Sequence, residues 1–179
     1  MPSLTDSLIS TDFPSFVHEF HKLCRGGQKL DPDPYLLQAF AMAEDIADGR
    51  VLRAAVSMPP GTSKTFTFGV ALPAWILAKN PSAQILVVEH HKKLARDTTR
   101  NIRKILRSKR FRRVFRTRVD ENWKGAGDFG TIQGGSVYAT SILGGITGYR
   151  ADVIIVDDPI SIKNANNMDK LEFVNEIRR

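Results

Sequence analysis

The segment MPPGTSKT, residues 58–65, contains the residue types that bind the phosphates of a nucleotide. A phosphate loop follows the pattern G-x-x-x-x-G-K-[ST]: backbone N–H groups surround the phosphates, the lysine contacts the terminal ones and the hydroxyl binds Mg²⁺. Lys64 and Thr65 match, whereas Met58 and Ser63 stand where the pattern has glycine. A plain strand-to-helix turn is the alternative, and serine fits only if the loop needs no positive φ at that position. We predict that the nucleotide is bound by Pro60, Gly61, Thr62, Ser63, Lys64 and Thr65.

Two carboxylates, Asp157 and Asp158, follow the short apolar run Val153–Val156. At the end of a buried strand, one carboxylate can hold the hydration shell of Mg²⁺, and the next can orient or deprotonate an attacking water. We therefore assign Asp157, with Thr65, to the metal, and Asp158 to the water. An acidic turn at the end of a strand explains the pair alone, but it is the weaker explanation once the phosphate loop is considered with it.

The hydrophobic pattern around these motifs predicts alternating helices and strands. Helices are predicted at 35–48, ended by Gly49, at 64–79, with a kink about one turn before Pro73, and at 91–108. Strands are predicted at 51–58, 84–89 and 153–156, and GTIQGGSVYATS is predicted to form a hairpin joined at Gly134 and Gly135. Strands that are apolar on both faces favour an α/β fold with a mainly parallel central sheet in a three-layer α/β/α arrangement.

Composition places the chain among ordinary globular proteins. It has 179 residues, 42% of them hydrophobic, and its single cysteine, Cys24, fits a reducing compartment without disulfides. The N-terminus lacks the pattern of a signal peptide, and the longest apolar stretch, 66–78, is shorter than the roughly 20 residues that span a bilayer. We expect a soluble, intracellular protein with residues 1–34 as an N-terminal appendage and residues 35–179 as one domain.

Positive charge is concentrated between Lys92 and Arg118, where 13 residues are Lys or Arg and only Asp97 is acidic. Such a block favours contact with a polyanion, and the sparse aromatic residues within it favour the backbone of a duplex over single strands. A solvated helix face, an exposed loop or a contact with an acidic subunit are the alternatives. The residues predicted to bind DNA are Arg100, Arg103, Arg107, Arg110 and Arg113.

Three segments together resemble phage terminase large subunits of the Asp-Asp-Pro type: DGRVLRAAVSMPPGTSKT, LPAWILAKNPSAQILVVEHH and LGGITGYRADVIIVDDPI. The similarity covers about residues 35–167. In that family the loop usually has arginine at the position of Gly61 and glycine at the position of Ser63. The resemblance implies a P-loop NTPase fold of the ASCE (RecA-like) class, with ATP and Mg²⁺ bound by the residues already assigned.

By the same resemblance, the protein would hydrolyse ATP in the cytoplasm of an infected bacterial cell and drive double-stranded DNA into a procapsid. Its partners would be further copies in a ring on the portal and the small terminase subunit. Lys64, Asp158 and Arg150 would be catalytic, Arg150 as an arginine finger in a neighbouring site. Alternatively, Arg150 forms a salt bridge with Asp152 or Asp157. Family members continue into a C-terminal nuclease domain with its own acidic metal site. We do not find that domain before Arg179, so the resemblance gives no basis for expecting DNA cleavage by these residues.

Tyr35 and Gln38 lie where related motors place residues that contact adenine. Two other functions stay open at this point. One is a helicase-like ATPase of the same fold, and the other is a non-hydrolysing module for DNA binding or assembly.

Overall fold

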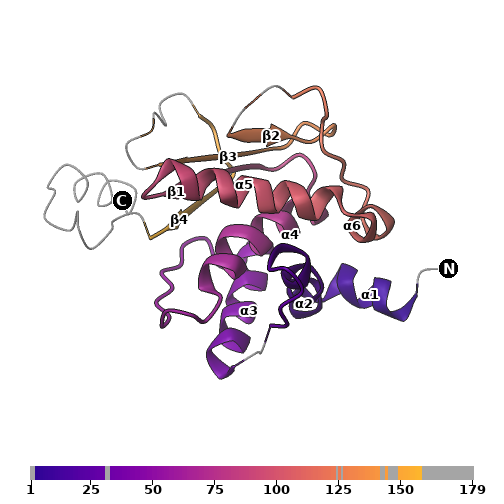
Figure 1. Cartoon of the computed structure of the whole chain (residues 1–179), viewed down its shortest axis with the longest axis vertical. Helices are drawn as coiled ribbons and strands as arrows, with labels where there is room; N and C mark the ends of the chain where they lie inside the picture. Colours follow the sequence, from indigo (N-terminus) through magenta and orange to yellow (C-terminus); the bar gives the residue numbers. More distant parts are fainter. Residues whose placement is uncertain are drawn as a thin grey trace, which may run out of the picture.

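The structure is a computed structural model that describes residues 3–30, 33–123, 125, 127–141, 144 and 149–158. It is an α/β fold in which helices pack on a four-stranded mixed sheet (Figure 1). None of the helices in these residues is long and apolar enough to cross a membrane. The elements are α1 (Leu4–Thr11), α2 (Phe13–Cys24), α3 (Pro34–Ala47), η1 (Thr65–Ala71), α4 (Leu72–Lys79), β1 (Gln84–Glu89), α5 (Lys92–Arg107), α6 (Lys109–Val114), β2 (Asp128–Gly130), β3 (Ser136–Ser141) and β4 (Val153–Asp157).

The sheet has the strand order β2-β3-β1-β4. β1 is parallel to β3 and to β4, whereas β2 and β3 form an antiparallel hairpin through Gly134, so the predicted parallel sheet and hairpin are confirmed. The register places Glu89 beside Ser141 on one side and beside Asp157 on the other. The carboxyl ends of three parallel strands therefore meet at one edge, which is where α/β sheets bind ligands.

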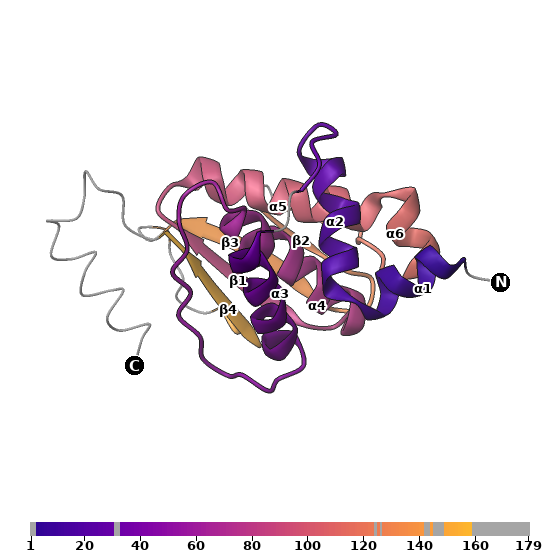
Figure 2. The same cartoon turned by 90° about the horizontal axis from the view of Figure 1, so that it is seen from below.

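The described helices cover one face of the sheet. Ile85 and Val87 of β1 belong to the main core together with the helices, whereas Leu86 and Val88 point to the other face and pack with Tyr138, Ala151 and Val156. Seen from below, α2, α3 and α4 lie in front of the strands (Figure 2). The described residues thus form two layers, and the third layer stays a prediction.

The predicted strand at 51–58 is wrong. Within the described residues this segment belongs to no helix or strand, and Leu52, Arg53, Ala54 and Ala55 are exposed. Only Val56 and Met58 pack against the core. The segment VLRAAVSM buries few of its side chains and so gains little from pairing, because sheet stability comes largely from packing of side chains on the two faces.

Residues 3–30 are part of the core, contrary to the expected appendage. Ile9 of α1 is buried, and Phe13, Phe16 and Phe20 of α2 are buried and contact Trp75 or Phe111. Caps define these helices, because Ser3 and Asp6 form a capping box and the Asp12 side chain accepts a hydrogen bond from the Ser15 N–H. These residues thus belong to the main hydrophobic core together with the later helices and the sheet of the described part of the chain.

The helix predicted at residues 64–79 is present but changes type before Pro73. Its first part, η1, is a π-helix, and the Leu72 N–H donates to the Thr67 carbonyl oxygen five residues earlier. Proline lacks an N–H and its ring crowds the carbonyl four residues before it, and a wider turn accommodates this. The expected kink thus takes the form of a π-helix.

Candidate nucleotide-binding site

A cavity of about 770 Å³ lies between the phosphate loop and the end of α2 with the segment that follows it. Its volume falls within the usual range of small-molecule sites. One wall consists of residues 58–66 and Asp158. The opposite wall contains residues that the sequence analysis did not identify, namely His21, Arg25, Gln28, Lys29, Leu30, Asp33 and Leu36.

The segment predicted to form the phosphate loop, residues 58–65, contains two residues with a positive φ. Gly61 has a φ of 85° and Ser63 a φ of 59°, both in the left-handed region. The Thr62 hydroxyl donates to the Pro59 carbonyl oxygen at 2.7 Å, and the Thr67 N–H donates to the Ser63 carbonyl oxygen at 2.9 Å. The loop therefore does require a positive φ at Ser63, at a cost of about 1–2 kcal/mol for a residue with a Cβ.

Thr65 and Asp157 meet at the first turn of η1. The Thr65 side chain lies beside the Asp157 carboxylate and helps to lower its pKa, and the backbone of Gly69 lies close to both side chains. Burial raises the pKa of Asp157, and the neighbouring charge of Asp158 raises it further, while Thr65 and Lys64 lower it; the net shift is upward. The two residues assigned to the metal thus lie beside one another, although they are on separate elements.

Lys64 and Asp158 form an ion pair, with 3.1 Å between Nζ and Oδ1. The Asp158 side chain is 66% exposed, and its backbone has a φ of 41°. The Nδ1–H of His90 donates to the Asp158 carbonyl oxygen at 3.1 Å. In this state the lysine charge is balanced by a carboxylate, with which phosphates would compete for the ammonium.

Glu89 is a third carboxyl group at the same edge, and the sequence analysis missed it. It is 3% exposed, it is the register neighbour of Asp157, and it accepts a hydrogen bond from the Thr98 hydroxyl of α5. Burial raises the pKa of Glu89, and the charge of Asp157 raises it further, against the lowering effect of Thr98. The signal was present in QILVVE, because this buried strand, like the strand before Asp158, ends in an acid.

Tyr35 and Gln38, predicted to contact adenine, do not line the cavity. Tyr35 is 60% exposed and Gln38 is also exposed, whereas Leu36 between them lines the cavity. Helical periodicity explains the difference, because α3 turns Leu36, Ala39 and Phe40 toward the core and so turns Tyr35 and Gln38 away.

Arg150 lies before the start of β4, whereas Asp157 is at its end. The strand alone separates the two residues by about 13 Å. Arg150 is exposed and forms no ion pair with any residue in the described ranges, so the alternative of a salt bridge with Asp152 or Asp157 is not seen there. Asp152 instead accepts a hydrogen bond from the Gln84 N–H at 2.8 Å.

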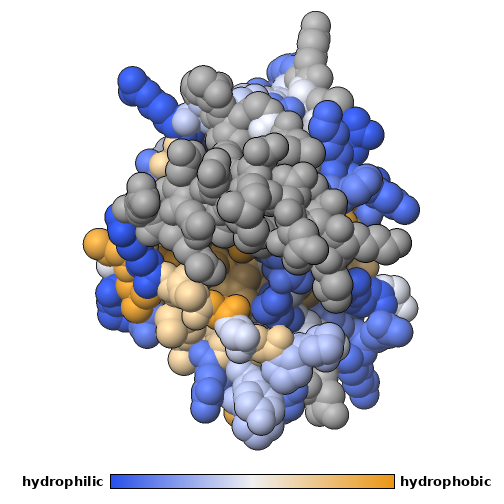
Figure 3. Space-filling view, turned by 90° about the vertical axis from the view of Figure 1, so that its left-hand side faces the viewer, coloured by the Kyte–Doolittle hydropathy of each residue, from blue (hydrophilic) through white to orange (hydrophobic). Residues whose placement is uncertain are grey.

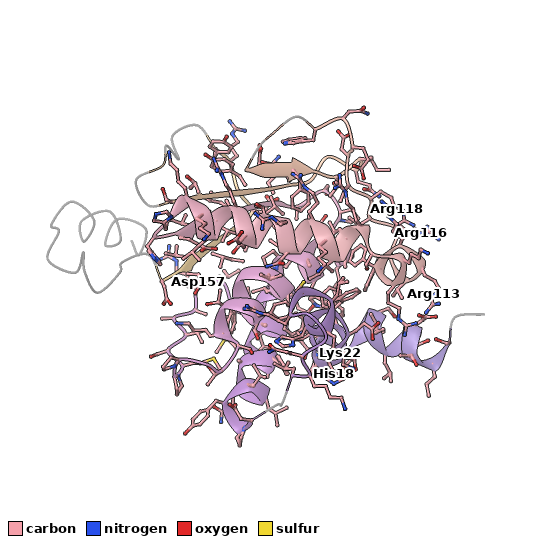
Figure 4. All side chains as sticks on the ribbon, viewed as in Figure 1. His18, Lys22, Arg113, Arg116, Arg118 and Asp157 are labelled. Atoms are coloured by element: carbon pink, nitrogen blue, oxygen red, sulfur yellow. The ribbon has the colours of Figure 1, made fainter. Side chains whose placement is uncertain are left out.

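All five arginines predicted to bind DNA have partners within the chain, and that of Arg100 is Asp97 on its own helix. Arg103 donates to the Asp128 carbonyl oxygen and lies over Phe129, and Arg107 pairs with Glu121. Arg110 and Arg113 both pair with Asp6. Arg113 also lies at the opposite end of the molecule from Asp157 (Figure 4). The arginines from Arg103 to Arg113 therefore hold α5 and α6 against neighbouring segments of the chain.

Thr65 and Asp157 are the residues of this site that could hold a Mg²⁺ ion. No group of three or more His, Cys, Asp or Glu side chains in the described part of the chain could hold a metal ion. Mg²⁺ keeps several waters and is usually held by one or two carboxylates together with phosphates of a substrate. The placement of Thr65 beside Asp157, next to a loop suited to phosphates, fits that requirement.

Comparison with known proteins gives one match. Residues 56–175 match the family described as terminase large subunit, T4likevirus-type, N-terminal. The match begins just before the phosphate loop and runs past Asp158. No curated protein and no solved structure matches the chain.

Proposed function

The chain belongs to the family of terminase large subunits of the T4-like type, in its N-terminal part, and on that premise we propose that it is the ATPase of a viral DNA-packaging motor. It would have a P-loop NTPase fold of the ASCE (RecA-like) class and hydrolyse ATP to move double-stranded DNA into a procapsid. The observation that carries the proposal is the placement of the Thr65 side chain beside the Asp157 carboxylate, next to the phosphate loop.

The phosphates would lie against residues 60–65, where backbone N–H groups and the Lys64 ammonium favour negative charge. Lys64 would bind the phosphates once its ion pair with Asp158 is broken. The Asp158 side chain is exposed, so it can change rotamer. The base and ribose would then lie toward the opposite wall, against Gln28 and Leu30. This assignment replaces Tyr35 and Gln38, which face away.

Thr65 and Asp157 would hold Mg²⁺, which when bound neutralises charge on the phosphate oxygens. Asp158, once released from Lys64, would orient the attacking water and accept its proton. Glu89 is buried beside Asp157 and accepts a hydrogen bond from Thr98, so it would add a third carboxyl group close to the metal site. Arg150 lies at the far end of β4, so it could act only in the site of a neighbouring copy, as in a ring on the portal.

Two substitutions test the proposal. Lys64→Ala should remove ATP binding, measured by fluorescence titration with a labelled ATP analogue, because the phosphates lose their cation. Asp158→Asn should keep binding and lose phosphate release. Lys109→Ala, which changes an exposed lysine on α6, is the matched control and should leave both unchanged. Unchanged ATP binding by Lys64→Ala would contradict the assignment of residues 60–65 as the nucleotide site.

One observation favours a second function, a non-hydrolysing module for DNA binding or assembly. Ser63 is strained, and Lys64 is occupied by Asp158. A loop locked in this state would bind nucleotide weakly and turn over none. Wild-type protein that binds DNA but shows neither ATP binding nor phosphate release would favour this function.

A further inference from the structure

A second hollow in the surface, a groove of about 470 Å³, lies at the start of α5. Its lining is almost entirely basic and consists of His91, Lys92, Lys93, Arg96, Asp97 and Arg100. The front of the molecule in Figure 1, where α5 lies, is the right-hand side in Figure 3. Hydrophilic residues, drawn in blue, lie along that side.

The positive charge in this groove is free, unlike that further along the basic block. Lys92, Lys93 and Arg96 are exposed and form no ion pair within the described residues. Arg100 pairs only with Asp97, at 2.9 Å, and its side chain is 73% exposed. The long side chains can therefore reach a partner without breaking contacts that hold the fold.

The spacing of these cations suits a linear polyanion. Lys92, Arg96 and Arg100 are four residues apart and so share one face of the helix. At 1.5 Å per residue they cover about 12 Å, or roughly three nucleotide steps along one strand of a duplex. Apart from the His91 imidazole, the lining has no ring on which a base could stack.

We propose that the groove formed by Lys92, Lys93, Arg96 and Arg100 binds the sugar-phosphate backbone of duplex DNA independently of sequence. The choice of DNA as the polyanion rests on the proposed function. The DNA surface then lies at the first half of α5 and not along Arg103 to Arg113, which the chain uses internally. It also lies next to the nucleotide site, because His90, two residues before α5, contacts Asp158.

The test measures the affinity of the whole chain for a short duplex of mixed sequence over a range of KCl concentrations. Each phosphate contact contributes about 0.9 to the slope of log affinity against log salt. Lys92→Gln/Lys93→Gln/Arg96→Gln should therefore reduce the slope by about 2–3. Arg107→Gln/Arg112→Gln, which removes two cations paired with Glu121, is the matched control and should keep the slope. Lys92→Arg/Lys93→Arg should keep it as well.

An unchanged slope in the triple variant, or an equal loss in the control, would overturn the proposal, as would a wild-type chain that binds no duplex. The thermal midpoint and ATP binding of the triple variant should match wild type, which separates loss of the groove from loss of the fold. Lys64→Ala should keep the DNA slope. Failure of the nucleotide site and failure of the DNA groove are thus distinguished by different variants.

Discussion

Ser63 adopts the backbone conformation that its position in the phosphate loop requires, although its side chain disfavours it. The sequence predicted which residues form the loop, because the pattern of Lys64 and Thr65 is local. It could not predict whether a positive φ is needed at Ser63, since that depends on how η1 and the loop are anchored to the core. Strain of this kind is typical of functional sites.

Ser63→Gly should therefore raise the free energy of unfolding by about 0.5–1 kcal/mol, because relief of strain exceeds the added entropy of an unfolded glycine. Urea denaturation measures the change. Gly61→Ala is the companion variant, and it should be destabilising because a Cβ is placed at a φ of 85°. A less stable Ser63→Gly protein would show that the loop does not hold this conformation in solution.

Glu89 shows what a single sequence conceals at the scale of one residue. An acid at the end of a strand is common, and only the register of β1 with β4 places it beside Asp157. The two residues are 68 positions apart in the sequence, so no local sequence pattern indicates that they are neighbours. Asp157 and Thr65, in contrast, were identified because their motifs have a known spatial relation.

Glu89→Gln should lower ATP turnover with little change in ATP affinity, because Glu89 lies beside Asp157 but does not line the cavity at residues 58–66. It should also stabilise the chain at neutral pH. The pKa of Glu89 is raised above 4.5, so the folded state is favoured when the group is protonated and loses stability as pH rises through that raised pKa. Steady-state kinetics and melting across pH measure both effects, and a variant less stable than wild type at neutral pH would contradict the burial argument.

At the scale of elements, periodic segments were predicted well and the connecting segment was not. α3, β1, α5 and β4 lie within a residue or two of their predicted bounds, because each buries one stripe or face. Residues 51–58 have a composition compatible with a strand but no partner among the described residues. A strand is a property of two neighbouring segments, so composition alone cannot establish it.

α1 and α6 are joined through one carboxylate, which makes their contact sensitive to acid. Burial tends to raise the pKa of Asp6, but the hydrogen bonds with Ser3 and the charge of Arg113 lower it below 3.8. The stability that Asp6 contributes is therefore present above about pH 4 and is lost as pH falls through the lowered pKa. Asp6→Asn should be less stable than wild type at pH 7 and should lose part of the acid dependence of melting. Identical melting curves for the two proteins from pH 3 to 7 would contradict this contact.

At the scale of the whole molecule, one aromatic cluster joins the N-terminal helices to the domain with the phosphate loop. Phe16 contacts Phe13, Phe20, Trp75, Phe111 and Phe115. The sequence contained local signals for these helices, namely S-x-x-D and D-F-P-S at their starts. It did not reveal that they share the core, because contacts between distant segments leave no periodic pattern.

Phe16→Ala should lower the free energy of unfolding by about 3–5 kcal/mol, the usual cost of removing a buried aromatic side chain. Phe16→Leu, which keeps most of the volume, should cost clearly less. Loss of ATP binding should follow unfolding of the whole chain, and both transitions should coincide in a denaturant titration. A Phe16→Ala protein as stable as wild type would restore the interpretation of residues 1–34 as an appendage.

The hydrogen bond from His90 to Asp158 joins the partner of Lys64 to the chain that enters α5. If ATP displaces Asp158 and thereby changes the duplex affinity of the groove by some factor, thermodynamic linkage requires the duplex to change ATP affinity by the same factor. In a motor with this coupling, no additional site would be needed to detect bound DNA. The duplex DNA would itself be an effector of the nucleotide site. His90→Ala should bring the factor by which ATP and duplex change each other's affinity toward one.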